Sequence, residues 1–380
     1  MFILEKPYVS DFLVETIKKN KFSIIKNEAS EKYFDKNVLM FDSLAVELLN
    51  CTDKIYSNSE NAIDWVSKNL PDSPLFEMIK ISKDKALFRE KIKSIYPNYY
   101  FKKVSLSKIK DMDSSTLPYP IILKPSVGFL SFGVYPIKNK EEWAEIIQKL
   151  DTEIEKFRGI FPKDVVNCDE FIIEKMIEGD EFALDAYFDS QGKATILNIF
   201  QHPFFDDKDV SDRAYFTSAK IIKKYHDKFK EILDKIGSEA GYKDFPFHLE
   251  LRANKNEIIP IELNPMRFCG WCITDIAYFA YGINPYEYYM KSLKPDWERI
   301  LADKNEIYYF TMADIPSNID NKKIKSVDYK SYLKNIKNPL EIRKIDFNNN
   351  PVFAIVFAKT PDLEEIKNIL KLDMAQFITV

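Results

Sequence analysis

The sequence predicts a multidomain protein that joins an α/β unit to α+β units. Short apolar runs alternate with helical segments over residues 1–82, which is typical of a small α/β unit with a parallel sheet. Strand-like runs separated by amphipathic helices follow over residues 83–300, and residues 301–380 add two strands and a helix. We therefore expect three units with these boundaries in a chain of 380 residues.

The first unit is predicted from the short runs FILEK, FSIIK, NVLMF and KIYSNS, each expected to be a strand. Helices are expected over Ser10–Lys19 and Asn61–Leu70. Strands that alternate with helices favour parallel pairing, because each helix carries the chain back to the edge where the next strand begins.

The second unit is predicted to mix helices with antiparallel strands. In order we expect a lysine-rich helix over 82–95, two strands around a loop in YPIILKPSVGFLSFGVYPI, a helix over 140–157, three antiparallel strands in EFIIEKMI, EFALDAYFD and ATILNIFQ, an irregular segment 202–219, and a helix over 223–240. In the third unit, EIYYFTMADI and PVFAIVFAK are expected to be strands, and 361–372 a helix.

A hairpin is predicted in the stretch from Phe245 to Phe268, with a turn at Ala253–Glu257. Apolar and polar side chains alternate on both sides of the turn, so each strand has one apolar and one polar face. If both apolar faces point into one core, even-numbered residues pair with even-numbered residues. The simplest register then sets Glu250 opposite Glu262, with Asn264 one step along.

This register would bring two carboxylates together, with Cβ atoms about 5 Å apart. Carboxylates that close repel, and one stays protonated unless a cation lies between them. Mg²⁺ takes a few carboxylate and amide oxygens at about 2 Å and keeps waters that a phosphate can replace. The hairpin is therefore interpreted as a magnesium–nucleotide platform. The alternative is an ordinary amphipathic hairpin with a solvated acidic face.

Composition narrows the classes of function. The net charge of −4, with lysines interleaved with acids, gives no reason to expect a nucleic-acid partner. No apolar run approaches the roughly 20 residues that span a bilayer, and the start, MFILEKPYVSDF, lacks the features of a signal peptide. Four cysteines do not make a disulfide framework in a chain of this length. We expect a cytoplasmic protein with no membrane partner.

The placement of glycine excludes the two commonest glycine-based nucleotide sites. None of the nine glycines precedes Gly128, so a dinucleotide fingerprint is impossible in the N-terminal third. The pair Gly192-Lys193 is followed by Ala194 and lacks the upstream glycine of a phosphate loop. A nucleotide site in this chain must therefore use another design.

A second chemical signal is the loop PSVGFLSFG, which follows an apolar strand ending at Lys124. Gly128, Ser131 and Gly133 give this loop backbone freedom. Backbone amides in such a loop, beside a lysine, can bind triphosphate oxygens. The alternative is a tight hairpin with a surface lysine.

A third signal is EKMIEGDEFALDAYF, where Gly179 marks a turn between two strands. Glu174 and Lys175 close the first strand, and Glu181 opens the second. The end of a strand can present backbone groups and a carboxylate to an adenine edge, and a nearby acid can bind ribose hydroxyls. The alternative is a charged hairpin turn.

The order of these motifs is more specific than any one of them. The chain gives, in sequence, Asp84-Lys85, Lys124 with its small-residue loop, Glu174, Gly179, Glu181, Glu250, and the run E-L-N-P-M-R at 262–267. This order resembles the ATP-grasp superfamily from Ser82 to about Leu293. The resemblance implies an ATP-grasp domain over 83–300, a Rossmann-like pre-ATP-grasp domain over 1–82, and a small C-terminal α+β unit over 301–380.

The resemblance also implies roles for individual residues. Arg267 and Lys124 would be catalytic, with Arg267 facing the γ-phosphate or an acyl phosphate. ATP would be held by Lys85, Lys124, Gly128, Ser131, Gly133, Glu174, Lys175, Met176 and Glu181, and Mg²⁺ (or Mn²⁺) by Glu250, Glu262 and Asn264.

Other residues are weaker candidates for the site. Arg213, His248 and Arg252 are expected to contact substrate, with a structural or surface role as the alternative for each. The pair Cys269 and Cys272 is interpreted as lining or packing under the substrate pocket rather than as a redox or metal site, because no second pair exists.

The resemblance implies an ATP-dependent ligase that joins a small-molecule carboxylate to an amine (or a thiol). The carboxylate would attack the γ-phosphate of ATP, and the acyl phosphate would be captured with release of ADP and phosphate. Two alternatives stay open: a bicarbonate-activating carboxylase, and a nucleotide-binding protein without catalysis. A homodimer is expected by analogy with proteins that this chain resembles.

Overall fold

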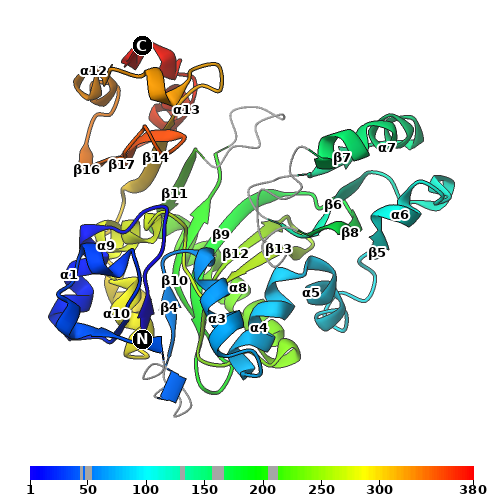
Figure 1. The fold of residues 1–380 in the computed structure, drawn as a ribbon, viewed down its shortest axis with the longest axis horizontal. Helices are drawn as coiled ribbons and strands as arrows, with labels where there is room; N and C mark the ends of the chain where they lie inside the picture. The colour runs from blue at the N-terminus through cyan, green and yellow to red at the C-terminus, as the bar shows by residue number, and fades with distance from the viewer. Residues whose placement is uncertain (43–45, 48–53, 129–132, 156–166, 204–212) are drawn as a thin grey trace.

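The computed structural model describes residues 1–42, 46–47, 54–128, 133–155, 167–203 and 213–380 (Figure 1). Within these residues the strands form two four-stranded sheets, one eight-stranded sheet and one two-stranded sheet. A parallel sheet near the N-terminus is followed by antiparallel sheets packed with helices. This confirms the predicted class, α/β and α+β in several units.

The first unit is a parallel sheet in the order β3-β2-β1-β4. Its strands are β1 (Phe2–Ile3), β2 (Ile24–Ile25), β3 (Leu39–Met40) and β4 (Tyr56–Ser57). Helix α1 (Asp11–Asn20) begins after Ser10, whose Oγ accepts a hydrogen bond from the Leu13 amide at 3.1 Å. Helix α3 (Ile63–Asn69) follows β4. These elements lie where the sequence predicts them.

The helix predicted over 82–95 is wrong in its bounds. The structure has two helices there, α4 (Pro74–Lys83) and α5 (Lys85–Lys91), separated by Asp84. Asp84 has extended backbone angles, and its Oδ1 accepts hydrogen bonds from the amides of Ala86 and Leu87 at 3.0 and 3.1 Å. An aspartate in this capping position starts a new helix and so interrupts the periodic pattern.

A four-stranded antiparallel sheet forms a separate lobe, on the right in Figure 1. Its order is β5 (Phe101–Ser105), β8 (Asn167–Lys175), β6 (Ile121–Val127) and β7 (Tyr135–Ile137). Helices α6 (Leu106–Ile109) and α7 (Lys140–Glu155) accompany it. Leu123, Trp143 and Phe171 belong to a core of its own. Two strands flank the predicted loop as expected, but β6 continues through Val127, so the strand predicted to end at Lys124 is three residues longer.

The central sheet has eight strands in the order β13-β12-β9-β10-β11-β14-β17-β16, and its neighbours are antiparallel. The strands are β9 (Asp180–Phe188), β10 (Ala194–Gln201), β11 (Ala214–Ser218), β12 (Phe245–Ala253), β13 (Ile258–Pro265), β14 (Ile307–Asp314), β16 (Pro339–Lys344) and β17 (Val352–Thr360). Strand β11 lies inside the segment predicted to be irregular, which corrects that prediction for residues 214–218.

Helix α8 (Ala219–Ala240) covers one face of the central sheet. The ring of Phe182 on β9 lies 4.5 Å from that of Tyr225 and 5.4 Å from that of Phe229 on α8, centroid to centroid. The opposite face of β9 carries Asp185 and Tyr187, since side chains alternate along a strand. The Tyr187 ring lies 5.5 Å from that of Tyr289 on α10 (Pro285–Met290), and the Tyr289 ring lies 6.4 Å from that of Tyr56 on β4, so that face looks toward the N-terminal unit.

Strands β8 and β9 belong to different sheets, although the sequence predicts them as neighbouring antiparallel strands. Strand β8 pairs with β5 and β6, whereas β9 pairs with β10 and β12. The turn between them contains Gly179 with φ of 118°, and a Cβ there would lie 2.5 Å from the Ala253 carbonyl oxygen. The glycine therefore lets the chain cross from the lobe to the central sheet close against the hairpin turn.

The remaining elements lie between the strands of the central sheet in sequence or follow its last strand. They are α9 (Ile276–Tyr281), α11 (Trp297–Ile300), α12 (Tyr329–Leu333), α13 (Glu364–Leu370), β15 (Ser326–Val327) and β18 (Ile378–Thr379). The predicted strands β14 and β17 and helix α13 are present, whereas β16 was not predicted. No helix in the described part of the chain has the length and apolar character needed to cross a membrane.

Candidate active site

The hairpin of β12 and β13 has the predicted register at its site end. Glu250 pairs with Glu262 and His248 with Asn264, even-numbered with even-numbered. A register shift follows Glu250, so Leu251 pairs with Pro260 and the predicted parity fails beyond that point. A bulge of this kind turns part of a strand relative to its partner. The bulge leaves the two glutamates side by side, as expected.

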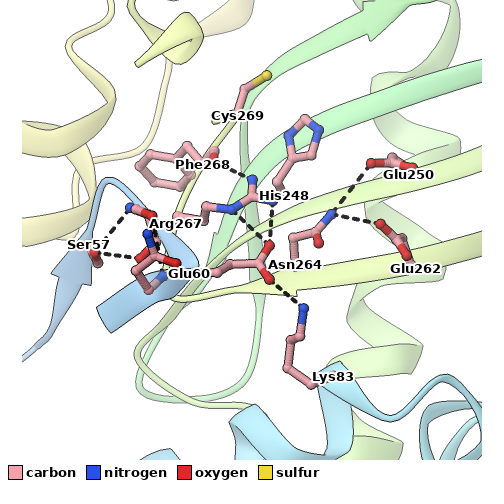
Figure 2. A network of polar contacts seen from close by, with 12 residues as sticks. Ser57, Glu60, Lys83, His248, Glu250, Glu262, Asn264, Arg267, Phe268 and Cys269 are labelled. Carbon is pink, nitrogen blue, oxygen red and sulfur yellow. Dashed lines mark hydrogen bonds and ion pairs between the residues drawn. The ribbon is translucent and has the colours of Figure 1, made fainter. Parts of the chain in front are cut away.

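Asn264 links the two carboxylates. Its Nδ2 lies 3.5 Å from Glu250 Oε1 and 3.4 Å from Glu262 Oε1, both long donor contacts (Figure 2). Turning this amide would direct its oxygen between the carboxylates, and amide orientation is assigned from such contacts. Two carboxylates and an amide oxygen are ligand types that suit Mg²⁺. The residues therefore fit a magnesium ion.

Among the described residues, no three or more His, Cys, Asp or Glu side chains lie close enough together to hold a metal ion by themselves. The protein would thus supply only part of an octahedral shell, which is usual for Mg²⁺ bound together with substrate phosphates. Lys85 Nζ lies 2.8 Å from Glu262 Oε2 and donates to the Gly128 carbonyl oxygen at 3.1 Å. Lys85 therefore connects the glutamate pair to the loop after Lys124.

The charge on Glu262 is strongly favoured. Burial raises the pKa of its carboxyl, but the attraction and hydrogen bond of Lys85, with Lys124 and Lys83 nearby, bring it down to about 2. The same attraction by Glu262 raises the pKa of Lys85 although burial lowers it. Lys85, Lys124 and Lys83 thus all favour the charged form of Glu262, and lysines of this kind can also supply positive charge to phosphate groups.

Lys124 and Glu174 form a buried ion pair between β6 and β8. Lys124 Nζ lies 2.5 Å from Glu174 Oε1, and Arg89 Nε donates to Glu174 Oε2 at 2.9 Å. Burial raises the pKa of Glu174, yet Arg89 and Lys124 together lower it to about 2. Burial, with a smaller contribution from the neighbouring cations Lys85 and Arg89, lowers the pKa of Lys124 against the opposing pull of Glu174.

Arg89 was not predicted from the sequence. Its side chain is 2 % exposed, and its guanidinium lies 4.6 Å from the centre of the Tyr99 ring. Its NH1 and NH2 have no hydrogen-bond partner in the described part of the chain. Arg89 reaches the site because its place on α5 brings it to Glu174 at the end of β8. The lysine-rich helical pattern in the sequence does not reveal this contact.

The predicted adenine contacts at Lys175 and Met176 lie at the end of β8, next to this cluster. Their amides donate to the carbonyl oxygens of Tyr100 and Pro120, each at 3.0 Å. The Lys175 carbonyl oxygen accepts from the Tyr99 hydroxyl at 2.7 Å. The backbone of this segment is thus held firmly at the junction of the lobe and the central sheet.

Glu181 and Arg252 lie together at the start of β9. Arg252 Nε donates to Glu181 Oε2 at 3.0 Å, and its NH1 donates to the Ile177 carbonyl oxygen at 3.1 Å. The arginine predicted as a substrate contact is therefore paired with the acid predicted to bind ribose. The two residues are register partners on β12 and β9, and Arg252 lies two positions after Glu250 on β12.

Arg267 reaches the N-terminal unit. Its Nε donates to Glu60 Oε1 at 3.0 Å and its NH1 to the Phe268 carbonyl oxygen at 2.9 Å, while Lys83 pairs with the other oxygen of Glu60 (Figure 2). Burial raises the pKa of Glu60, but Lys83 and Arg267 lower it to about 2. Glu60 and Lys83 were not predicted. The available signal was SNSENA, a polar run after β4 at the carboxyl end of a parallel sheet.

The side chain of His248 is held by Asp185 on the neighbouring strand β9. Its Nδ1 lies 2.7 Å from Asp185 Oδ1, and the Cys269 amide donates to the same oxygen at 2.7 Å. Asp185 is fully buried on β9, directly opposite His248 in register. Asp185 was not singled out in the sequence, where it is one polar residue in an otherwise apolar strand, EFALDAYF.

The remaining predicted residues lie elsewhere or outside the described part of the chain. Ser131 falls outside the described residues, while Gly128 and Gly133 flank that gap. Arg213 lies before β11, where its carbonyl oxygen accepts from the Met312 amide at 2.7 Å. The Cys269 amide donates to Asp185, and Cys272 is a buried free thiol whose pKa burial raises to about 11. A high thiol pKa favours a packing role for Cys272 over redox chemistry.

Comparisons with known proteins agree with this architecture. Residues 117–275 match the family model described as an ATP-grasp domain. A search of curated proteins by sequence gave no match. Among solved structures, an L-amino acid ligase from Bacillus licheniformis superposes with a TM-score of 0.68 at 15% identity, covering 99% of this chain and 97% of that one.

Two other solved structures show the same fold. Phosphoribosylglycinamide synthetase from Anaerococcus prevotii gives a TM-score of 0.59 at 18% identity, covering 100% of this chain and 98% of that one. The biotin carboxylase domain of 2-oxoglutarate carboxylase from Hydrogenobacter thermophilus, solved with MgADP, ADP and bicarbonate, gives 0.62 at 15% identity, covering 95% and 86%. The predicted fold is thereby confirmed.

Proposed function

We propose that this chain, whose residues 117–275 match the family model of an ATP-grasp domain, is an ATP-dependent ligase that joins a carboxylate to an amine. One observation carries the proposal. Glu250 and Glu262 stand opposite each other with Asn264 in contact with both, Lys85 pairs with Glu262, and Arg267 follows the end of the same strand, β13. This arrangement suits a metal-bound triphosphate, because the carboxylates can bind the metal cation and the lysine and arginine side chains can bind the phosphates.

Each group has a part in holding the nucleotide. Glu250, Glu262 and Asn264 would bind Mg²⁺ (or Mn²⁺), which would neutralise phosphate charge as it develops. Lys85 and Lys124 would exchange their ion pairs with Glu262 and Glu174 for contacts with ATP phosphates. Arg89 stays on Glu174 during that exchange, so the buried carboxylate keeps a counter-charge.

The first chemical step needs positioning more than a reactive side chain. A substrate carboxylate oxygen attacks the γ-phosphorus of ATP, and the bond to the β-phosphate oxygen breaks to release ADP. Charge in this transition state lies on phosphoryl oxygens, where Arg267 and Lys124 would stabilise it. The amine then displaces phosphate from the acyl phosphate. Glu181, with the backbone of Lys175 and Met176, would hold the nucleoside.

A bicarbonate-activating carboxylase is a second candidate, favoured by the structural likeness to a biotin carboxylase domain solved with bicarbonate. Both candidates transfer the γ-phosphoryl group of ATP to an acid, and they differ in the acid that is activated and in what receives the activated group. Bicarbonate-dependent ADP release without an amine would support the carboxylase.

A substrate screen tests the proposal. The purified protein would be incubated with Mg²⁺, ATP and pooled carboxylates and amines, with released phosphate measured and products read by mass spectrometry. We expect phosphate release that needs both an acid and an amine, with a condensation product of matching mass. ATP binding without turnover in any pool, or turnover with bicarbonate alone, would overturn the ligase assignment.

A further inference from the structure

One carboxylate joins the start of helix α5 to the separate lobe. Asp84 lies between α4 and α5, where the chain passes toward the lobe (Figure 1). Its Oδ1 accepts hydrogen bonds from the amides of Ala86 and Leu87 at 3.0 and 3.1 Å. The same oxygen accepts from the hydroxyl of Ser126 on β6, and Oδ2 accepts from Lys103 Nζ on β5 at 2.9 Å. Two strands of the lobe are therefore bound to the residue that caps α5.

The two neighbours of Asp84 in the chain contact other parts of the protein. Lys83 pairs with Glu60 of the N-terminal unit. Lys85 Nζ lies 2.8 Å from Glu262 Oε2 on β13 of the central sheet. Three consecutive side chains thus reach the N-terminal unit, the lobe and the central sheet in turn. These three residues therefore link all the parts of the protein that contribute groups to the site.

The Ser126 end of this link lies close to the second lysine that is expected to hold ATP phosphates. Ser126 follows Lys124 by two residues on β6, a separation of about 7 Å along a strand. Asp84, in turn, directly precedes Lys85. The contact between Asp84 and Ser126 therefore lies within two residues of both lysines, one on each of the two elements that it joins.

The fold holds the positive charges of these two lysines near each other. Burial lowers the pKa of Lys124, Glu174 opposes that shift, and the positive charge of Lys85 adds to it. Like charges this near repel each other, so separating α5 from β6 would relieve the repulsion. The bond between Asp84 and Ser126 opposes that separation. A triphosphate bound by both lysines turns the repulsion into attraction, provided that their spacing matches its oxygens.

We propose that Asp84, through Ser126, is a positioning residue for the phosphates of ATP: it holds α5 against β6, so that Lys85 and Lys124 keep the spacing that a triphosphate requires. Asp84 acts through the two lysines and is not itself a ligand, because four donors already bind its two oxygens. The inference rests on the proposed function, since it takes the two lysines as phosphate ligands. It adds that one buried contact between α5 and the lobe sets the affinity for the nucleotide.

Removing the Ser126 hydroxyl breaks this contact and leaves the rest of the network in place. In Ser126→Ala the cap of α5 and the pair between Asp84 and Lys103 remain. We expect the dissociation constant for ATP with Mg²⁺, measured by calorimetry, to rise about tenfold, a typical effect of losing one hydrogen bond to a charged group. The dissociation constant for adenosine, which carries no phosphate, should stay within about twofold of the parent when measured by competition, because only the phosphate contacts depend on this spacing.

Three further variants separate positioning from a general loss of structure. Asp84→Asn keeps an oxygen that can accept from Ser126 and from the α5 amides, so it should hold ATP within about threefold of the parent. Lys103→Met removes the exposed partner of Asp84 on β5 and is the matched control, which should bind ATP as the parent does. Ser126→Cys keeps the volume and weakens the donor, so it should change ATP affinity in the same direction as Ser126→Ala even if that variant does not fold.

The outcomes decide between the two levels of the argument. An unchanged affinity for ATP in the Ser126 variants, or an equal loss of affinity for ATP and adenosine, would overturn the positioning role. Equal weakening of ATP binding in Lys103→Met would also overturn it, because any bond to the lobe would then have the same effect. A parent protein that does not bind ATP with Mg²⁺ would instead refute the proposed function, and this inference with it.

Discussion

Arg267 is bound to Glu60, a residue more than two hundred positions away in the sequence, through Nε and Oε1 at 3.0 Å. Glu60 follows β4 of the N-terminal unit, whereas Arg267 follows β13 of the central sheet. Lys83 at the end of α4 pairs with the other oxygen of the same carboxylate. The N-terminal unit therefore supplies one of the groups that set the arginine expected at the transferred phosphoryl.

Replacing Glu60 should destabilise the protein and impair turnover. Glu60→Ala leaves the buried Lys83 and the largely buried Arg267 without this counter-charge, and losing one partner of a buried pair costs about 3–5 kcal/mol. Unfolding in urea would measure this cost. Glu77→Gln on α4, an exposed acid paired with Lys80, is the matched control and should change stability by less than about 0.5 kcal/mol. Equal effects of both changes would contradict the buried-pair interpretation.

The metal assignment predicts loss of turnover in the double variant Glu262→Gln, Asn264→Ala. Removing one carboxylate and the amide leaves Glu250 as the sole predicted ligand, so we expect no detectable ADP formation at any Mg²⁺ concentration. Steady-state assays across a Mg²⁺ titration would test this. Glu257→Gln, an exposed acid in the turn of the same hairpin, should behave as the parent. Unchanged activity in the double variant would refute the assignment.

Acid should destabilise the protein within a defined pH range. The carboxyls of Glu60, Glu174 and Glu262 each have a folded pKa of about 2 against an ordinary value of 4.5. Because the folded values are lowered, their contribution is fully present above pH 4.5 and is lost as the pH falls toward 2. In urea unfolding between pH 7 and pH 2, the contribution of these carboxyls to the free energy of unfolding should stay constant down to about pH 4.5 and then fall steeply. A decline that is complete above pH 5 would point to other groups.

Two glycines offer a matched test of backbone geometry. A Cβ at Gly179 would lie 2.5 Å from the Ala253 carbonyl oxygen, whereas nothing lies within 4 Å of one at Gly241. Both have positive φ, 118° and 73°. Gly241→Ala should therefore cost only the left-handed strain, about 1–2 kcal/mol, and Gly179→Ala about 3 kcal/mol or more. Thermal unfolding of the two variants would compare them, and a smaller effect at Gly179 would contradict the close approach.

Local patterns predicted the parts of the site that lie on one hairpin. Period-two alternation was enough to place Glu250 opposite Glu262, because the pairing depends on neighbours joined by a short turn. The same reasoning missed the bulge after Glu250, since a single extra residue leaves no sign in the alternation. The helix over 82–95 failed for a related reason: the cap formed by Asp84 is one residue inside a pattern that otherwise continues.

Contacts between distant segments escaped prediction. Arg89, Glu60 and Asp185 each join the site through residues far away in the chain, and no spacing in the sequence indicates those partners. The exchange of sheets between β8 and β9 escaped for the same reason. The boundaries near residues 82 and 300 remain predictions.

The hydrogen bonds between β11 and β14, from Ala214↔Thr311 to Ser218↔Ile307, run across the predicted boundary near residue 300. The last eighty residues are thus an integral part of the fold, since β14, β17 and β16 complete a sheet that starts at the hairpin of β12 and β13. Ending the chain there would remove β14, one of the two neighbours of β11. The backbone amides and carbonyls of β11 would then form an exposed sheet edge that can pair with another molecule. A shortened protein should accumulate as insoluble aggregate, even though every predicted ligand of ATP would still be present.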